Sequence, residues 1–98
     1  MLTISDIKST AESVAKGTDI VQLILFGSYA KGTATSNSDI DLFMMSNGKI
    51  TGLAFFDIKS KLEDAFCTEI DLIPDLDVLP NSPIERQIQK TGVVIYEQ

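Results

Sequence analysis

The chain has 98 residues, 44% of them apolar, and a net charge of −6, which predicts one folded domain over residues 1–98 and excludes a disordered chain. No window reaches the ~18 consecutive apolar residues of a membrane span and the N-terminus lacks a signal-peptide pattern, so we expect a cytoplasmic protein without a membrane partner. With only 8 basic residues, direct binding to nucleic acid is not expected.

The first half of the sequence predicts two helices and two strands in alternation. Their ranges, in chain order, are a helix over 5–16, a strand over 20–26, a short helix over 29–31 and a strand over 39–45. The first helix is indicated by apolar residues at helical spacing, with Ser5 as its cap and Gly17 at its end. The first strand is a short, apolar, β-branched run, and Ser28 stands near the N-cap of the short helix that follows.

The second half continues the alternation with two more helices and two more strands. Their ranges are a helix over 52–66, a strand over 69–73, a helix over 83–91 and a strand over 92–97. Ser82, Pro83 and Glu85 form a helix-start pattern, and Gly92 closes that helix. Cys67 is the only cysteine, so an internal disulfide is excluded, and its apolar helical context predicts a buried small hydrophobe.

The alternating order of helices and strands predicts an α+β fold, close to the α/β class, with helices packed on one sheet. The link between the first two strands contains only a short helix, which favours an antiparallel pair. The longer helix between the second and third strands suits a parallel crossover. We therefore expect a mixed four-stranded sheet with helices mainly on one face. Its modest core favours contacts with a partner, in a homo-oligomer or a hetero-oligomer.

Two aspartates in the second predicted strand are the first candidates for chemistry. Asp39 and Asp41 are two residues apart, so their carboxylates share one face of the strand. If the strand over 69–73 pairs beside them, Asp71 adds a third carboxylate. Three carboxylates so close together repel one another, and one or two divalent cations remove that conflict. The chain has no histidine, so any metal must be held by oxygen, which indicates Mg²⁺, Mn²⁺ or Ca²⁺.

The Gly27-Ser28 pair is the second candidate, because it ends a strand and begins a helix. Glycine lets a phosphate approach the backbone, and a helix N-terminus favours negative charge. Lys31, one turn further on, can add a positive charge towards that phosphate. A Gly-Ser pair alone is more often a structural turn, and a lone lysine is more often a solvated surface charge. A single aspartate in a strand more often lies at the solvent-exposed edge of a half-exposed strand.

The combination is more specific than its parts. The spacing G-S-x10-D-x-D arises by chance about once in a thousand chains of this length, at a usage of roughly 5–7% per residue type. The aspartates also recur as Asp-Leu in two separate apolar segments, IDLF and IDLI. An anion-binding turn beside a metal-binding carboxylate set predicts metal-assisted phosphoryl or nucleotidyl transfer.

The stretch GSYAKGTATSNSDIDL, with the later EIDLI, resembles the nucleotidyltransferase superfamily that shares the DNA polymerase beta palm. It is most similar to the minimal nucleotidyltransferases (MNT) of that superfamily, over most of the chain. The family pattern is met in full by Gly27, Ser28, Asp39 and Asp41. Asp71 falls where the third family carboxylate is expected. Family members often carry arginines in the helix after Gly-Ser, where this chain has Tyr29 and Lys31.

The resemblance implies a polymerase-beta-palm-type fold and an Mg²⁺-dependent enzyme that uses two metal ions, with Mn²⁺ as an alternative. It implies that Asp39 and Asp41 hold the metal and the nucleoside triphosphate, and that Asp71 helps bind the second metal and acts on the attacking hydroxyl. Gly27 and Ser28 would hold the β- and γ-phosphates. The implied reaction transfers AMP from ATP to a hydroxyl. Short MNT proteins are commonly antitoxins that AMPylate a tyrosine of a HEPN-family RNase toxin, so such a toxin is the expected partner.

Three other functions fit the same residues. One is a nucleotidyltransferase that modifies a hydroxyl of a small molecule. Another is a binding module with the same fold that neutralises its partner by occlusion, although the intact set of three aspartates argues against it. The third is a structural domain with incidental aspartates. No motif that would recognise the base is visible in the sequence.

Overall fold

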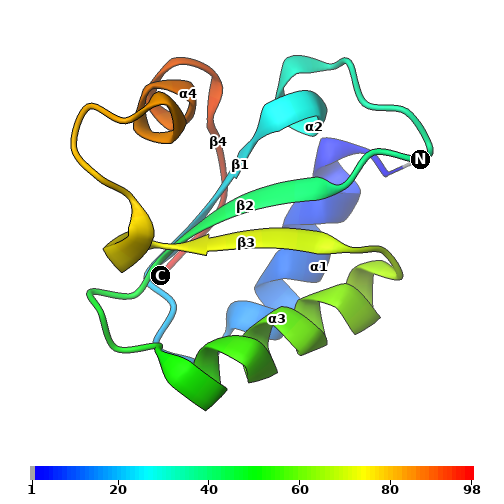
Figure 1. Ribbon diagram of the computed structural model, residues 1–98. Helices are drawn as coiled ribbons and strands as arrows, with labels where there is room; N and C mark the ends of the chain where they lie inside the picture. The colour runs from blue at the N-terminus through cyan, green and yellow to red at the C-terminus, as the bar shows by residue number, and fades with distance from the viewer. Residues whose placement is uncertain (1) are drawn as a thin grey trace.

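The computed structural model describes residues 2–98, which form a four-stranded sheet with helices on both sides (Figure 1). The strands are β1 (Gln22–Phe26), β2 (Ile40–Met45), β3 (Ile70–Pro74) and β4 (Val93–Glu97), arranged in the order β3-β2-β1-β4. Strand β1 pairs antiparallel with both β2 and β4, whereas β2 and β3 are parallel. The predicted mixed sheet, with its antiparallel first pair and its parallel crossover, is confirmed.

The helices are α1 (Ile4–Ala15), α2 (Gly27–Lys31), α3 (Gly52–Phe66) and α4 (Pro83–Thr91), and a 3-10 turn, η1 (Asp75–Asp77), follows β3. The long helices α1 and α3 cover one face of the sheet, and the shorter helices α2 and α4 lie on the other side, so the helices are shared between the two faces rather than gathered mainly on one (Figure 1). Within residues 2–98, no helix is long and apolar enough to cross a membrane.

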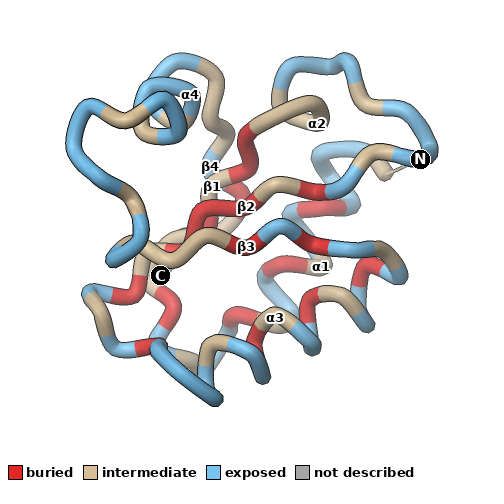
Figure 2. Tube along the Cα trace, viewed as in Figure 1, coloured by how far each residue is buried: buried red, intermediate tan, exposed pale blue. Residues whose placement is uncertain are grey.

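The main core lies between the sheet and the two long helices (Figure 2). Strand β2 shows how alternation separates this core from the outer face. Ile40, Leu42 and Met44 are fully buried in the core, whereas Asp41 and Phe43 point to the opposite side. Phe43 is buried as well, along with Phe26 of β1, because α2 and α4 cover part of the outer face. Asp41 is therefore a half-buried carboxylate beside aromatic side chains.

The starts of the first two helices differ from the sequence prediction. Helix α1 is capped by Thr3 rather than Ser5, because Thr3 and Asp6 form a reciprocal capping box. Helix α2 begins at Gly27, so Ser28 lies within its first turn rather than near its N-cap. In each case the helix starts one or two residues earlier than the sequence predicts.

The prediction that Cys67 is buried is wrong, because its thiol is exposed. Helix α3 ends at Phe66, and Cys67 caps it with a left-handed backbone (φ 55°). The buried residues of α3 step by four, from Ile58 to Leu62 to Phe66. The next residue therefore falls outside the apolar stripe, although its local sequence is apolar.

Carboxylates accept backbone hydrogen bonds at both ends of the parallel pair β2–β3. At the start of β3, the backbone N–H of Ile70 donates to Glu63 Oε2 on α3, at 3.2 Å. At the far end, the backbone N–H groups of Ser46 and Gly48 each donate to Asp75 Oδ2, at 3.3 Å. Because β3 has only one neighbouring strand, Glu63 gives the N–H of Ile70 a partner that a second strand would otherwise provide, whereas the Asp75 bonds join the segments that follow β2 and β3.

Candidate active site

The three aspartates selected from the sequence lie where β2 and β3 begin, beside the end of β1. Asp41 and Asp71 are register partners on the two parallel strands. Asp41 is also the register partner of Phe26, the last residue of β1. Asp39 is exposed and lies one residue before β2. The fold thus brings Asp71 beside Asp41, which the catalytic interpretation of the sequence requires.

The carboxyl of Asp41 has the strongest electrostatic perturbation in the site. The pKa of Asp41 is raised from 3.8 to about 6, first by burial and then by the charges of Asp71 and Asp39 and a hydrogen bond with Asp71. Simultaneous ionisation of the three carboxyls is therefore unfavourable. A proton or a bound cation relieves this conflict, as in oxygen-ligand sites for divalent metals.

The chemistry of the donors fits Mg²⁺ or Mn²⁺, because all three are carboxylates. Across residues 2–98, however, no three acidic or thiol side chains converge closely enough to hold one metal ion in their present positions. The backbone register sets Asp41 beside Asp71, and Asp39 is exposed one residue before β2. The chemistry of the three donors therefore fits a divalent metal, although their present positions do not converge on one ion.

Gly27 is held against Asp41 at the turn from β1 into α2. Its φ of +73° lies in the left-handed region that favours glycine. A Cβ atom at this position would overlap Asp41 Oδ2, so any side chain here would collide with the carboxylate. Ser28 follows in the first turn of α2, where no side chain caps the first backbone N–H groups. The predicted phosphate-binding turn and the predicted metal carboxylate are therefore in contact.

Lys31 lies at the end of α2, in a groove between α2 and α4 that contains none of the three aspartates. The groove is lined by Lys31, Pro83, Arg86, Gln87, Lys90 and Thr91. Of the site residues selected from the sequence, Lys31 is the one that lines this groove.

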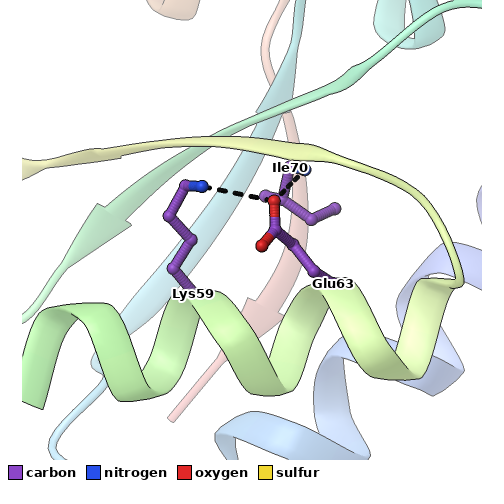
Figure 3. A network of polar contacts seen from close by, with 3 residues as sticks. All are labelled: Lys59, Glu63 and Ile70. Atoms are coloured by element: carbon purple, nitrogen blue, oxygen red, sulfur yellow. Dashed lines mark hydrogen bonds and ion pairs between the residues drawn. The ribbon is translucent and has the colours of Figure 1, made fainter.

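A second groove borders the aspartates on the side of α3 and contains residues that the sequence did not single out. It has a volume of about 480 Å³ and is lined by Asp39, Lys59, Glu63, Glu69, Ile70 and Asp71. Lys59 is the cation of this groove, and its Nζ lies 3.2 Å from Glu63 Oε2 (Figure 3). The N–H of Ile70 and then Lys59 hold the pKa of Glu63 below its ordinary value.

Glu63 helps to position Asp71, because its carboxylate accepts a hydrogen bond from the backbone N–H of Ile70, the residue immediately before Asp71. The i, i+4 spacing of Lys59 and Glu63 is visible in the sequence and predicts a helical ion pair. That spacing does not reveal that the same carboxylate also receives an N–H from the neighbouring strand.

Residues 7–98 match the model of the family described as "Polymerase beta, Nucleotidyltransferase". Among curated proteins, the chain is 39% identical over 54 residues to the protein adenylyltransferase MntA of Shewanella oneidensis. That match covers 54% of this chain and 39% of MntA, so the chain spans well under half the length of this relative.

Solved structures share the fold at low sequence identity. A crystal structure of a toxin-antitoxin with AMP-PNP has a TM-score of 0.73 at 23% identity, covering 99% of this chain and 75% of that one. A tri-AMPylated Shewanella oneidensis HEPN toxin in complex with MNT antitoxin has a TM-score of 0.63 at 19% identity, covering 97% and 70% of the two chains. These similarities confirm the predicted palm-type fold.

Proposed function

Because this chain belongs to the polymerase beta nucleotidyltransferase family, we propose that it is an Mg²⁺-dependent enzyme that transfers AMP from ATP to a tyrosine of a HEPN toxin. In that role the chain is the antitoxin of the pair. The observation that carries the proposal is the register of β2 and β3, which sets Asp71 beside Asp41 while Gly27 contacts Asp41. The described activity of MntA and the AMP-bearing toxin found with an MNT antitoxin support it.

The proposed reaction divides the work among the residues of the site. Asp39 and Asp41 would hold Mg²⁺ and the triphosphate, and Asp71 would help hold a second Mg²⁺. Bound metal would supply positive charge to the phosphates. The backbone at Gly27 and the hydroxyl of Ser28 bind the β- and γ-phosphates.

Asp71 accepts the proton of the attacking hydroxyl in this scheme. The hydroxyl oxygen forms a bond to the α-phosphorus of ATP. The bond from that phosphorus to the oxygen bridging to the β-phosphate breaks, and pyrophosphate leaves with the electron pair. Because Asp39 and Asp71 are both exposed, a side chain of another protein can reach them.

An exposed apolar patch supports a protein partner rather than a small molecule. The patch comprises Leu53 and Phe56 of α3, Leu76 of η1 and Leu79, which are 88%, 65%, 66% and 69% exposed. Part of it borders a groove formed with Ile50 and Pro74. Phe56 and Leu76 line this groove together, and exposed apolar surface often marks protein contacts. The patch lies near the end of β3 opposite to Asp71, so a docked partner would leave the carboxylates accessible.

Incubation with Mg-ATP and the co-encoded neighbouring protein is expected to add one or more AMP units to a tyrosine of that neighbour. Intact-mass measurement followed by peptide mapping checks the number and the position of the additions. An Asp71→Asn variant provides the matched control and is expected to give no addition. Neutralisation without a mass gain from any nucleoside triphosphate would favour the occlusion alternative over catalysis.

Mg²⁺ or Mn²⁺ together with ATP is expected to raise the melting temperature of the chain. Ligand at a hundred times its Kd stabilises a native state by about 2.7 kcal/mol, which corresponds to roughly 10 °C or more for a domain of this size. Thermal melts with metal alone, ATP alone and both together measure the effect. An unchanged melting temperature at millimolar metal and ATP would contradict the site.

A further inference from the structure

A basic groove between α2 and α4 lies beside the proposed nucleotide site. Lys31 of α2 lines one side, and the other side is lined by Pro83, Arg86, Gln87, Lys90 and Thr91 of α4. The α4 residues follow the spacing i, i+3, i+4, i+7, i+8 and therefore form one face of that helix. The groove has a volume of about 320 Å³. Helix α4 thus turns one continuous face towards the end of α2.

The three cations of this groove are concentrated and unneutralised in an acidic protein. The chain has 8 basic and 14 acidic residues, and no acidic residue lines the groove. In the part of the chain that the structure describes, the ion pairs are Lys59–Glu63 and Lys61–Asp57, so none of the three groove cations is paired. Like charges that face one another repel, and a bound anion removes that cost.

The groove is lined by the last residue of the helix whose first residues form the proposed phosphate-binding turn. Lys31 follows Gly27 by four residues and Ser28 by three, so all three lie on neighbouring positions of α2. Helical side chains lean towards the N-terminus, which directs Lys31 back along this turn. Helix α2 contacts both β2 and α4, and Figure 1 shows it between α4 and the start of β2. A triphosphate held at Gly27 would therefore extend towards α4.

We propose that Lys31, Arg86 and Lys90 form a polyphosphate site that binds the terminal phosphates of the nucleotide and the pyrophosphate product. This inference rests on the proposed function and assigns a role to α4. An arginine can donate two parallel hydrogen bonds to a phosphate, and a lysine supplies a compact positive charge. Gln87 offers a further donor in the same groove, whereas the hydroxyl of Thr91 already donates to the backbone carbonyl of Gln87. The site would stabilise negative charge on the leaving group during transfer.

Calorimetric binding of inorganic tripolyphosphate, ATP and AMP to the full chain tests the site without any toxin. The Arg86→Gln/Lys90→Gln variant is expected to bind tripolyphosphate and ATP about tenfold more weakly than wild type. Its affinity for AMP is expected to be unchanged, because AMP lacks the β- and γ-phosphates. The Arg86→Lys/Lys90→Arg variant keeps both charges and is expected to retain most of the binding.

A Lys8→Gln/Lys16→Gln variant is the matched control, since it removes two positive charges from α1 and its C-cap, on the opposite face of the sheet. Unchanged tripolyphosphate binding in the Arg86/Lys90 variant, or equal weakening in the Lys8/Lys16 control, would overturn the site. Weakening confined to the Arg86/Lys90 variant supports the site even if no transfer to a toxin is found. The two proposals can therefore fail separately.

Discussion

An Asp41→Asn variant is expected to lose AMP transfer by roughly 10³-fold or more, and in metal-free buffer at neutral pH to melt at a higher temperature than wild type. Activity falls because a neutral amide is a weaker ligand for a divalent cation, and Asp41 is the central carboxylate, in register with Asp71 and in contact with Gly27. Stability rises because the substitution removes a partly buried charge that is repelled by Asp71 and Asp39.

The pH dependence of this stabilisation follows from the pKa of Asp41. That pKa is about 6 in the folded chain and 3.8 ordinarily, so the folded state binds the proton more tightly than the unfolded state. The contribution of Asp41 to stability is therefore complete below the unfolded pKa and is lost as the pH rises through the folded pKa. The advantage of Asp41→Asn over wild type should grow between about pH 4 and pH 6 and stay constant above.

Thermal melts with a chelator across this pH range measure the stability effect, and transfer assays with Mg-ATP measure the activity. An Asp19→Asn variant is the control, because it makes the same charge change at an exposed loop position before β1. Normal transfer by Asp41→Asn would show that the metal assignment is wrong. A melting temperature no higher than that of Asp19→Asn would show that the carboxylates do not repel one another in the folded chain.

A Gly27→Ala variant is expected to be destabilised by roughly 2–5 kcal/mol and to lose nucleotide binding. Two costs add at this position. The backbone is left-handed, with φ +73°, and the new Cβ would overlap Asp41 Oδ2. Relief of the overlap requires Asp41 or the turn to move, which displaces the proposed metal ligand from the phosphate-binding backbone.

A Gly32→Ala variant separates the two costs. Gly32 has φ +76°, and a Cβ atom there would meet nothing within 4 Å, so only the backbone cost of about 1–2 kcal/mol is expected. Chemical denaturation gives both free energies of unfolding. In an Asp41→Ala background, Gly27→Ala should cost little more than Gly32→Ala, because the nearest carboxylate atoms are gone. Equal costs of the two glycine substitutions in the wild-type background would contradict the contact.

The sequence predicted most of the fold because its local signals agree with the tertiary structure. Ser82 caps α4, Pro83 begins it and Gly92 ends it, as the sequence pattern indicates. The repeated Asp-Leu pairs of IDLF and IDLI occupy matching places in the parallel register, where Asp41 faces Asp71 and Leu42 faces Leu72. The leucines of both strands point into the core, and the aspartates point to the opposite face of the sheet.

The features that the sequence did not predict depend on contacts between distant segments. The bond from Ile70 to Glu63 exists because the outer edge of β3 leaves an N–H without a strand partner. The basic groove exists because α4 packs beside α2, and the spacing of Arg86 and Lys90 alone does not reveal where Lys31 lies. Periodicity indicates which face a helix buries, but it does not indicate which helix will lie opposite.

Because β3 is an edge strand, the proposed reaction depends on β3 staying attached to the sheet. Strand β3 pairs with β2 alone, and its other attachments are the bonds of Glu63 and Asp75 and the packing of Ile70 and Leu72 in the core. A local opening that detaches β3 would withdraw Asp71 and leave Asp39 and Asp41 in place on the remaining three strands. The site would then bind nucleotide without a base to activate the acceptor. A partner that seals the edge of β3 would therefore raise the fraction of molecules competent for transfer.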